Sequence, residues 1–373
     1  MDEKRFIDLA VAGVRDLAPY QAGKPISELQ RELGIDDIIK LASNENPLGA
    51  SPKVIRIVKE LADEVGLYPD GNGFDLKRRL AEFHDVPLPQ ITLGSGSDHI
   101  LELIARVFLG EGRSAVISQY AFAIYAIVSK AAGAQLRVAN AFPEGHGKAY
   151  GHDLDAMFAL IDETTRVVFI ANPNNPTGTY VSGQELKAFL DRVPKDVVVV
   201  LDEAYTEYVD AGDYTDGSEL VKQYDNLVLL RTFSKAYGLA GLRVGYALSN
   251  PVITDLLNRV RLAFNPNLLA QAAAIAALDD REHMERTVKL NREGMQQMQA
   301  AYDELGLAYI PSVCNFITVD VGDGKAVFDA LLKQGVITRP LAPYGMPKHL
   351  RISIGTREEN QRLIAALRKV LAR

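Results

Sequence analysis

Five short runs along the chain are apolar at almost every position. They are residues 114–118 (SAVIS), 167–171 (VVFIA), 197–201 (VVVVL), 227–230 (LVLL) and 244–248 (VGYAL). Such continuous apolarity is typical of strands that are buried on both faces of a sheet. Segments with helical spacing lie among these runs, at residues 99–108, 122–132 and 184–193. The alternation predicts an α/β fold in which a mainly parallel sheet has helices on both faces.

The pattern changes after Asn265. A long helical stretch runs from about residue 268 to 305, and two strand-like runs, NFITVDV and LRISIG, then flank another helix before a final one. This order predicts a smaller α+β domain at the C-terminal end. We therefore expect a large domain over residues 46–265 and a small domain over residues 266–373. Residues 1–45 are expected to pack with the small domain or to reach a partner subunit.

The charges of the chain are mixed rather than grouped. The 373 residues include 41 Lys and Arg against 48 Asp and Glu, for a formal net charge of −7. No basic block is present that would follow a nucleic-acid backbone or an anionic membrane surface. We therefore expect small-molecule partners, with neither nucleic acid nor membrane among them.

The cysteine content and the N-terminal sequence narrow the setting of the protein. A single cysteine, Cys314, cannot form an intramolecular disulfide, and no cysteine–histidine cluster has the spacing of a zinc site, so no metal is expected. The first ten residues, MDEKRFIDLA, lack the apolar core of a secretory signal. No stretch of about 20 uncharged apolar residues occurs. A cytoplasmic protein is the expectation.

The most informative segment covers residues 231–245, RTFSKAYGLAGLRVG, which follows one apolar run and ends at another. Thr232, Ser234, Lys235 and Arg243 bring two hydroxyls, an amine and a guanidinium together. Such a set can bind a phosphate beside an amine that loses its proton readily, because neighbouring cations disfavour the ammonium form. Taken alone, the segment also fits a solvated lysine in a glycine-containing turn.

Two further polar segments follow apolar runs. Asp202 and Tyr205 lie in LDEAYTEY, at the carboxyl end of a predicted strand, where open α/β sheets bind their ligands. A carboxylate there can keep a pyridine nitrogen protonated, although an aspartate that caps a helix is an equal alternative. Asn175 lies in ANPNNPTG, where its amide can donate to a ring oxygen, but Asn and Pro also explain a simple turn.

A glycine-rich turn, LGSGSDHI at residues 93–100, leads into a predicted helix. The backbone N–H groups of such a turn and the positive end of the helix can hold a phosphate. Glycine turns of this kind are weak evidence when they occur singly.

Together, and in this order, these segments resemble the fold-type I pyridoxal-phosphate-dependent aminotransferases. The resemblance covers nearly the whole chain, since LASNENPLG and LRISIG also match substrate-side motifs of that family. It implies a seven-stranded sheet and pyridoxal 5′-phosphate as cofactor, carried by Lys235 as a Schiff base. Asp202 would pair with the pyridine nitrogen, and Tyr205 and Asn175 would bond the ring's phenolic oxygen.

The resemblance also assigns the remaining contacts of the cofactor and the substrate. Residues implied to hold the cofactor phosphate are Gly96, Ser97, Asp98, Thr232, Ser234 and Arg243. Phe122, in SQYAFAIY, would stack on the ring, although AFAI departs from the threonine-rich form of some members. Arg351 would bind the substrate α-carboxylate through its guanidinium fork. His99 is another departure, because related chains often have an acidic residue there.

Four segments look most like the histidinol-phosphate aminotransferases. They are APYQAGKPISEL, LASNENPLGASP, LYPDGNGFDLKRRLA and GVITRPLAPYGMPKHLRISIG. In that subfamily the positions of Tyr20 and Arg339 serve the substrate phosphate, and Asn46 belongs to a substrate-side motif. Tyr68 is typically contributed across the interface of a homodimer. Packed apolar surface is the alternative for Tyr20 and Tyr68.

The reaction implied is transamination between histidinol phosphate and 2-oxoglutarate, giving imidazole-acetol phosphate and glutamate, with the reverse direction serving histidine biosynthesis. Lys235 would also move the proton at the reacting carbon. Two enzymatic alternatives stay open: an aromatic amino-acid aminotransferase, and a threonine-phosphate decarboxylase. A non-enzymatic alternative, the aminotransferase-like half of a transcription regulator, requires a DNA-binding domain for which this chain has no room.

Overall fold

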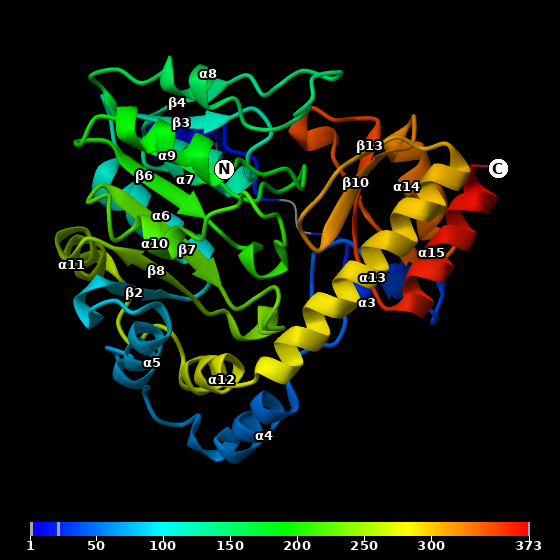
Figure 1. Cartoon of the computed structure of the whole chain (residues 1–373), viewed down its shortest axis with the longest axis horizontal. Coiled ribbons are helices and arrows are strands. Elements are labelled where there is room, and N and C mark those ends of the chain that lie inside the picture. Colours follow the sequence, from blue (N-terminus) through cyan, green and yellow to red (C-terminus); the bar gives the residue numbers. More distant parts are fainter. Residues whose placement is uncertain (1–2, 21–22, 372–373) are drawn as a thin grey trace.

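A seven-stranded sheet forms the centre of the larger domain of the computed structural model, which describes residues 3–20 and 23–371 (Figure 1). Its strands are β2 (Ile91–Gly94), β3 (Ser114–Ser118), β4 (Gln135–Ala139), β5 (Thr165–Ala171), β6 (Val198–Asp202), β7 (Leu227–Thr232) and β8 (Gly245–Ser249). The spatial order is β2-β8-β7-β6-β5-β3-β4. Strand β8 runs antiparallel to both of its neighbours, and the other pairs are parallel. The predicted α/β class and mainly parallel sheet are confirmed.

Alternate residues of the central strands enter two separate cores, one on each face of the sheet. In β5, Val168 and Ile170 pack into one buried cluster, whereas Val167 and Phe169 pack into the other. Helices that cover the first face include α5 (Phe74–His84) and α9 (Gly183–Arg192). Helices that cover the second face are α6 (Ser97–Phe108), α7 (Ala123–Ala131) and α11 (Pro251–Val260). Burial on both faces explains why these strands are apolar at every position.

The smaller domain lies beside the large one and is built on a four-stranded antiparallel sheet (Figure 1). Its strands, in the order β12-β13-β10-β9, are β9 (Tyr309–Ile310), β10 (Phe316–Asp320), β12 (Arg339–Pro340) and β13 (His349–Ser353). Three helices pack against it: α13 (Arg281–Leu305), α14 (Gly324–Leu332) and α15 (Arg357–Val370). The expected α+β character of this part is confirmed.

The helical stretch expected from residue 268 to 305 is two helices rather than one. Helix α12 (Leu268–Leu278) ends before Asp280, whose side chain caps the start of α13 by accepting from the His283 amide. The alanines of α12 belong to the buried cluster of the large sheet, and α12 packs against α5 and α4 (Pro52–Glu60). Residues 268–278 therefore pack with the large domain, although the expected boundary at residue 266 assigns them to the small one.

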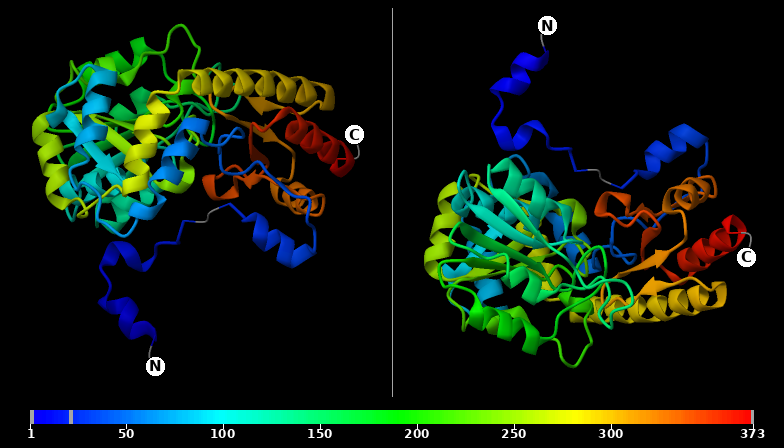
Figure 2. Two further views of the ribbon diagram at one scale, coloured as in Figure 1. Left: turned by 90° about the horizontal axis from the view of Figure 1, so that it is seen from below. Right: turned by 90° about the horizontal axis from the view of Figure 1, so that it is seen from above.

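The N-terminal segment divides into two parts. Strand β1 (Ile39–Lys40) pairs in parallel with β11 (Val336–Ile337), and Leu29 of α3 (Ile26–Leu33) packs against Ala42 and Ile337. This part packs with the small domain. Helix α1 (Glu3–Leu9) projects away from the rest of the molecule, while α2 (Ala12–Arg15) contacts α7 (Figure 2).

The remaining elements are short. Helices α8 (Leu154–Phe158) and α10 (Gly217–Leu220) follow strands of the large sheet. Short 3-10 helices lie at η1 (Ala62–Glu64), η2 (Leu88–Gln90), η3 (Thr206–Tyr208), η4 (Ala240–Leu242) and η5 (Ala342–Tyr344). No helix in the described part of the chain is long and apolar enough to cross a membrane.

Candidate active site

A cavity of about 320 Å³ opens at the carboxyl edge of the large sheet, where β5, β6 and β7 end. Its walls come from the large domain, the small domain and the segment that precedes β1. Most of the side chains predicted to bind cofactor or substrate line it: Tyr20, Ser97, Asp98, Phe122, Asn175, Asp202, Tyr205, Thr232, Ser234, Lys235, Arg243, Arg339 and Arg351. Residues that are far apart in the sequence therefore share one site.

Lys235 lies in the turn that follows β7. Its Nζ donates to the Ser43 backbone oxygen at 3.1 Å and lies 5.9 Å from the centre of the Tyr205 ring. Burial, and then the positive charge of Arg351, lower the pKa of the Lys235 amine to about 8. A substantial fraction of the amine is therefore neutral near physiological pH, as a nucleophile or a general base requires.

Asp202 is the last residue of β6 and is buried. Its Oδ2 accepts from the Tyr125 hydroxyl at 2.7 Å, whereas its Oδ1 has no partner among the residues that the structure describes. Burial raises the pKa of this carboxyl to about 6. An unpartnered buried carboxylate oxygen is costly, so a ligand that donates a hydrogen bond to it would be bound more strongly.

Arg351, on β13 of the small domain, reaches across to the large domain. Its guanidinium donates to Asn175 Oδ1 at 2.5 Å and to the Ala42 backbone oxygen at 2.6 Å. Its Nε is buried without a partner among the described residues. Arg351 is therefore held at the cavity wall, and the two bonds leave further N–H donors of its guanidinium unused.

The glycine turn forms the end of the cavity that suits a phosphate. Gly96 directly precedes α6 and adopts a φ of 87°, which favours glycine. The first backbone N–H groups of α6 are not used within the helix and can bind an anion. A Cβ at Gly245 would lie 2.6 Å from the Ser97 backbone nitrogen, which explains why this strand begins with glycine. Arg243 contacts Asp98 Oδ1 at 2.8 Å and Ser234 Oγ at 3.4 Å.

Phe122, Tyr20 and Arg339 also line the cavity. The Tyr20 ring meets Phe122 edge-on at 6.3 Å between centroids, and the Arg339 guanidinium lies 5.8 Å from the Tyr20 ring centre. A cation beside a phenol suits a phosphate or a carboxylate. The predicted grouping of Tyr20 with Arg339 thus has a geometric counterpart.

Known proteins share this arrangement. Residues 36–367 match the family of class I and II aminotransferases. The chain belongs to this family. It is 57% identical over 371 residues to histidinol-phosphate aminotransferase 2 of Pseudomonas fluorescens (strain Pf0-1), covering 99% of each chain. It is 51% identical over 372 residues to histidinol-phosphate aminotransferase 1 of Nitrosococcus oceani, covering 100% of this chain and 99% of that one.

Solved structures superpose on most of the chain. The crystal structure of histidinol-phosphate aminotransferase from Sinorhizobium meliloti in complex with pyridoxal-5′-phosphate matches with a TM-score of 0.88 at 29% identity, covering 97% of each chain. The L-threonine-O-3-phosphate decarboxylase of Porphyromonas gingivalis, at 22% identity and a TM-score of 0.77, shares the fold; the match covers 90% of this chain and 100% of that one. The resemblance to aminotransferases that the sequence motifs indicate is confirmed.

Two residues expected at the substrate side of this aminotransferase are not brought into the cavity. Tyr68 is 81% exposed, stacks on Phe264 at 4.3 Å, and is absent from the described residues that line the cavity. Asn46 is buried, and its Nδ2 donates to the Ala236 backbone oxygen and to Thr287 Oγ1. These bonds hold the Asn46 side chain away from the cavity. Asn44, two residues earlier, lines the cavity instead.

Sequence reasoning missed several cavity residues, of which Tyr125 and Asn44 matter most. Tyr125 lies three residues after Phe122, a spacing that places both on one side of α7, so helical periodicity could have found it. Asn44 donates to the Tyr205 hydroxyl at 2.9 Å and adopts a φ of 55°. No sequence signal distinguishes Asn44 from Asn46, because the backbone turn decides which side chain points inward.

The two departures from the family pattern leave these contacts in place. His99 pairs with Asn265 at 2.9 Å on the first turn of α6, and burial lowers the pKa of its imidazole. Phe122 borders the cavity although the sequence around it is AFAI. Neither substitution removes a cavity residue. Among residues 3–20 and 23–371, no group of three or more metal-binding side chains is found.

Proposed function

We propose that this chain catalyses pyridoxal-phosphate-dependent transamination between histidinol phosphate and 2-oxoglutarate. The observation that carries the proposal is one cavity that combines the Lys235 amine, the unpartnered oxygen of Asp202 and the guanidinium of Arg351. The relatives named histidinol-phosphate aminotransferase, at more than half identity over the full chain, support this choice of substrate. In the biosynthetic direction, imidazole-acetol phosphate and glutamate would be consumed.

The residues present fit pyridoxal phosphate. Asp202 Oδ1 suits the protonated ring nitrogen, and Lys235 lies in the same cavity as the amine that would carry the cofactor. Gly96, Ser97 and Asp98 at the start of α6, with Thr232, Ser234 and Arg243, suit its phosphate. When bound, the cofactor supplies an electron sink for the carbanion at the reacting carbon.

The protein's own contribution to the chemistry is proton transfer and orientation. Lys235, with its lowered pKa, would take the proton from the reacting carbon and return it to the cofactor carbon on the other side of the substrate nitrogen. Tyr205 is buried and fixed by Asn44. Asn175 is tied to Arg351. These contacts fix the side chains around the amine and exclude water from them.

One site must accept two dissimilar substrates in turn. Arg351 is placed for the α-carboxylate of glutamate or 2-oxoglutarate. Histidinol phosphate has no carboxylate, so its phosphate would be bound by Tyr20 and by Arg339, which lies opposite Arg351 on the neighbouring strand. Both cations lie in the small domain, on β13 and β12, so the small domain selects the substrate.

A substrate panel tests this proposal. The purified protein, supplied with pyridoxal phosphate and 2-oxoglutarate, is mixed with histidinol phosphate, phenylalanine or threonine phosphate, and glutamate and CO₂ are followed. We expect glutamate from histidinol phosphate with the highest kcat/KM and no CO₂ from any of the three. A wide preference for phenylalanine would favour an aromatic aminotransferase, and CO₂ from threonine phosphate would favour a decarboxylase.

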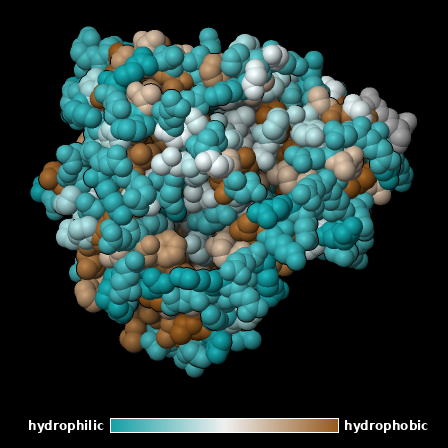
Figure 3. Space-filling model, in the orientation of Figure 1, coloured by the Kyte–Doolittle hydropathy of each residue, from teal (hydrophilic) through white to brown (hydrophobic). Residues whose placement is uncertain are grey.

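We further propose a homodimer in which Tyr68 completes the site of the partner subunit. Exposed apolar side chains gather on the segments around it: Val65, Leu67, Tyr68, Phe74, Leu262 and Phe264. Hydrophobic surface is visible at the lower edge of the molecule, near α4 (Figure 3). An exposed patch of this kind is typical of a subunit interface.

Hybrid dimers test the shared site. Lys235→Ala and Tyr68→Ala chains with different tags are co-expressed, and the mixed dimer is purified. We expect it to regain about half of the wild-type activity, because one of its two sites is intact. A mixed dimer of Lys235→Ala with Asp202→Asn is the control, since both residues come from one subunit and neither site is intact. Equal inactivity of the two hybrids would contradict a shared Tyr68.

We place this reaction in the cytoplasm. The single cysteine, Cys314, leaves the chain without an intramolecular disulfide, as is usual where thiols are kept reduced. Cell fractionation of the native, untagged protein checks the location, and recovery with the periplasmic or membrane fraction would contradict it.

A further inference from the structure

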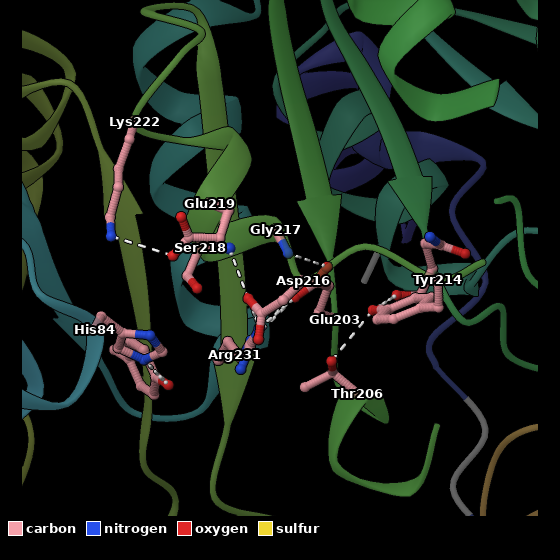
Figure 4. A network of polar contacts seen from close by, with 12 residues as sticks. His84, Glu203, Thr206, Tyr214, Asp216, Gly217, Ser218, Glu219, Lys222 and Arg231 are labelled. Carbon is pink, nitrogen blue, oxygen red and sulfur yellow. Dashed lines mark hydrogen bonds and ion pairs between the residues drawn. The ribbon is translucent and has the colours of Figure 1, made fainter. Parts of the chain in front are cut away.

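A buried ion pair lies behind the cavity, on the other face of the sheet. Arg231 is 5% exposed and Glu203 is fully buried (Figure 4). Along β7, side chains alternate between the faces, so Thr232 faces the cavity while Arg231 points away from it. Neither Arg231 nor Glu203 contacts the space where cofactor or substrate would lie.

The contacts of this pair are close and complete. Arg231 donates to Glu203 Oε2 through Nε at 3.1 Å and through NH2 at 2.6 Å, and to Asp216 Oδ1 at 2.7 Å. The other oxygen of Glu203 accepts from the Gly217 amide at 2.9 Å. Both carboxylate oxygens of Glu203 are therefore fixed, one by β7 and one by the start of α10.

The same cluster reaches the end of a third strand. The Tyr214 hydroxyl lies 3.0 Å from the Asn172 backbone oxygen and 3.2 Å from Thr206 Oγ1 (Figure 4). Asn172 directly follows β5 and lies three residues before Asn175. Polar contacts behind the sheet thus connect the ends of β5, β6 and β7, which carry the ring contacts in front of it.

We propose that Arg231 and Glu203 are positioning residues for transamination, because they fix the strand ends that hold Asp202 and Lys235 relative to each other. Glu203 is the neighbour of Asp202, and Arg231 is four residues from Lys235. A shift of either strand end changes the distance between the ring-nitrogen contact and the catalytic amine. The inference rests on the proposed function, since it concerns how that reaction is aligned.

Stability alone is a weak explanation for such a pair. Removing two charges from water costs about as much as their attraction returns, so well-packed apolar residues would serve a purely structural role equally well. A role in alignment explains why the ion pair is useful, because a misplacement of reacting groups by about 1 Å can lower the rate roughly 100-fold.

A matched pair of substitutions separates alignment from general damage. Glu203→Gln replaces one carboxylate oxygen by an NH₂ group, which must then face either Arg231 or the Gly217 amide, both of them donors. Glu219→Gln is the same chemical change on α10, at an exposed residue that forms an ion pair with Lys222 at 3.2 Å. Arg231→Lys, with exposed Arg259→Lys as its control, repeats the test if Glu203→Gln does not fold.

The readout is the separation of kcat from KM, with thermal unfolding measured in parallel. For Glu203→Gln we expect kcat to fall roughly 10- to 100-fold, with the KM for 2-oxoglutarate within about twofold of wild type, because Arg351 is untouched. A kcat equal to that of Glu219→Gln, whatever the loss of thermal stability, would overturn the inference. Failure of the wild-type chain to transaminate would instead overturn the proposed function.

Discussion

The two sides of the cavity are built in different ways. On the cofactor side, Asp202 and Thr232 are buried at the ends of adjacent strands in one sheet, and Lys235 is a partly buried residue in the turn that follows the second strand. On the substrate side, Tyr20 lies in the N-terminal segment and is 46% exposed. Arg339 belongs to the antiparallel sheet of the small domain. In the proposed function, adjacent strand ends of one sheet therefore supply the chemical groups, whereas separate segments supply the groups that select the substrate.

This difference predicts how substitutions act. Changes on the cofactor side are expected to lower kcat for every substrate, because each substrate uses the same amine and carboxylate. Changes on the substrate side are expected to alter kcat/KM for one substrate more than for another.

The largest effect is expected for Lys235→Ala, which removes both the cofactor attachment and the proton carrier. We expect kcat to fall by more than about 10⁴-fold for histidinol phosphate and for phenylalanine alike. Steady-state assays of glutamate formation measure it, with exposed Lys289→Ala as the control. A loss of kcat confined to one substrate would contradict the expectation that changes on the cofactor side affect every substrate.

A smaller general loss is expected for Asp202→Asn. The amide keeps the size of the carboxylate and still accepts from Tyr125, but it cannot hold a positive charge on the ring nitrogen. We expect kcat to fall roughly 10²- to 10³-fold for all substrates. Exposed Asp255→Asn provides the matched control, and an Asp202→Asn enzyme with unchanged kcat would contradict the role of this carboxylate.

Selective loss is expected for Arg339→Gln. Removing the cation costs the charge-assisted contact with the substrate phosphate, so kcat/KM for histidinol phosphate should fall about tenfold or more. Phenylalanine carries no second anion, and its kcat/KM should change less than about twofold. An equal loss for both substrates would indicate that Arg339 serves the chemistry on the cofactor side rather than the choice of substrate.

The pH dependence of cofactor capture tests the lowered pKa of the Lys235 amine. In cofactor-free protein the amine is protonated below its pKa of about 8, so capture of pyridoxal phosphate should slow about tenfold for each pH unit below it. Above about 8 the rate should level off. Arg351→Met removes a positive charge and should move the midpoint upward, whereas a rise that continues to the ordinary lysine value of 10.5 would contradict the lowered pKa.

The sequence predicted the cofactor side better than the substrate side for a physical reason. Parallel strands end at one edge, so polar residues that follow apolar runs must meet there, and Asn175, Asp202 and Lys235 do line one cavity. Asn46 and Tyr68 lie in irregular segments, where no periodicity reports the direction of a side chain. Structure alone shows that Asn46 is turned inward beneath the site and that Tyr68 lies on the surface.

The same limit applies to the helices and to the polar cluster behind the sheet. The break between α12 and α13 lies at two aspartates inside a continuous helical pattern, so periodicity does not reveal it. Arg231 begins the segment that contains Lys235, and Glu203 follows Asp202. That these two side chains meet is visible only from the pairing of β6 with β7 and the alternation of their side chains.

Covalent trapping of the cofactor tests the central claim most directly. The purified protein is saturated with pyridoxal phosphate, reduced with borohydride, digested and mapped by mass spectrometry. We expect the pyridoxyl group on Lys235 alone, with no specific label in Lys235→Ala protein. Stoichiometric label on another lysine, with Lys235 unmodified in an active enzyme, would contradict the assignment of this cavity as the cofactor site.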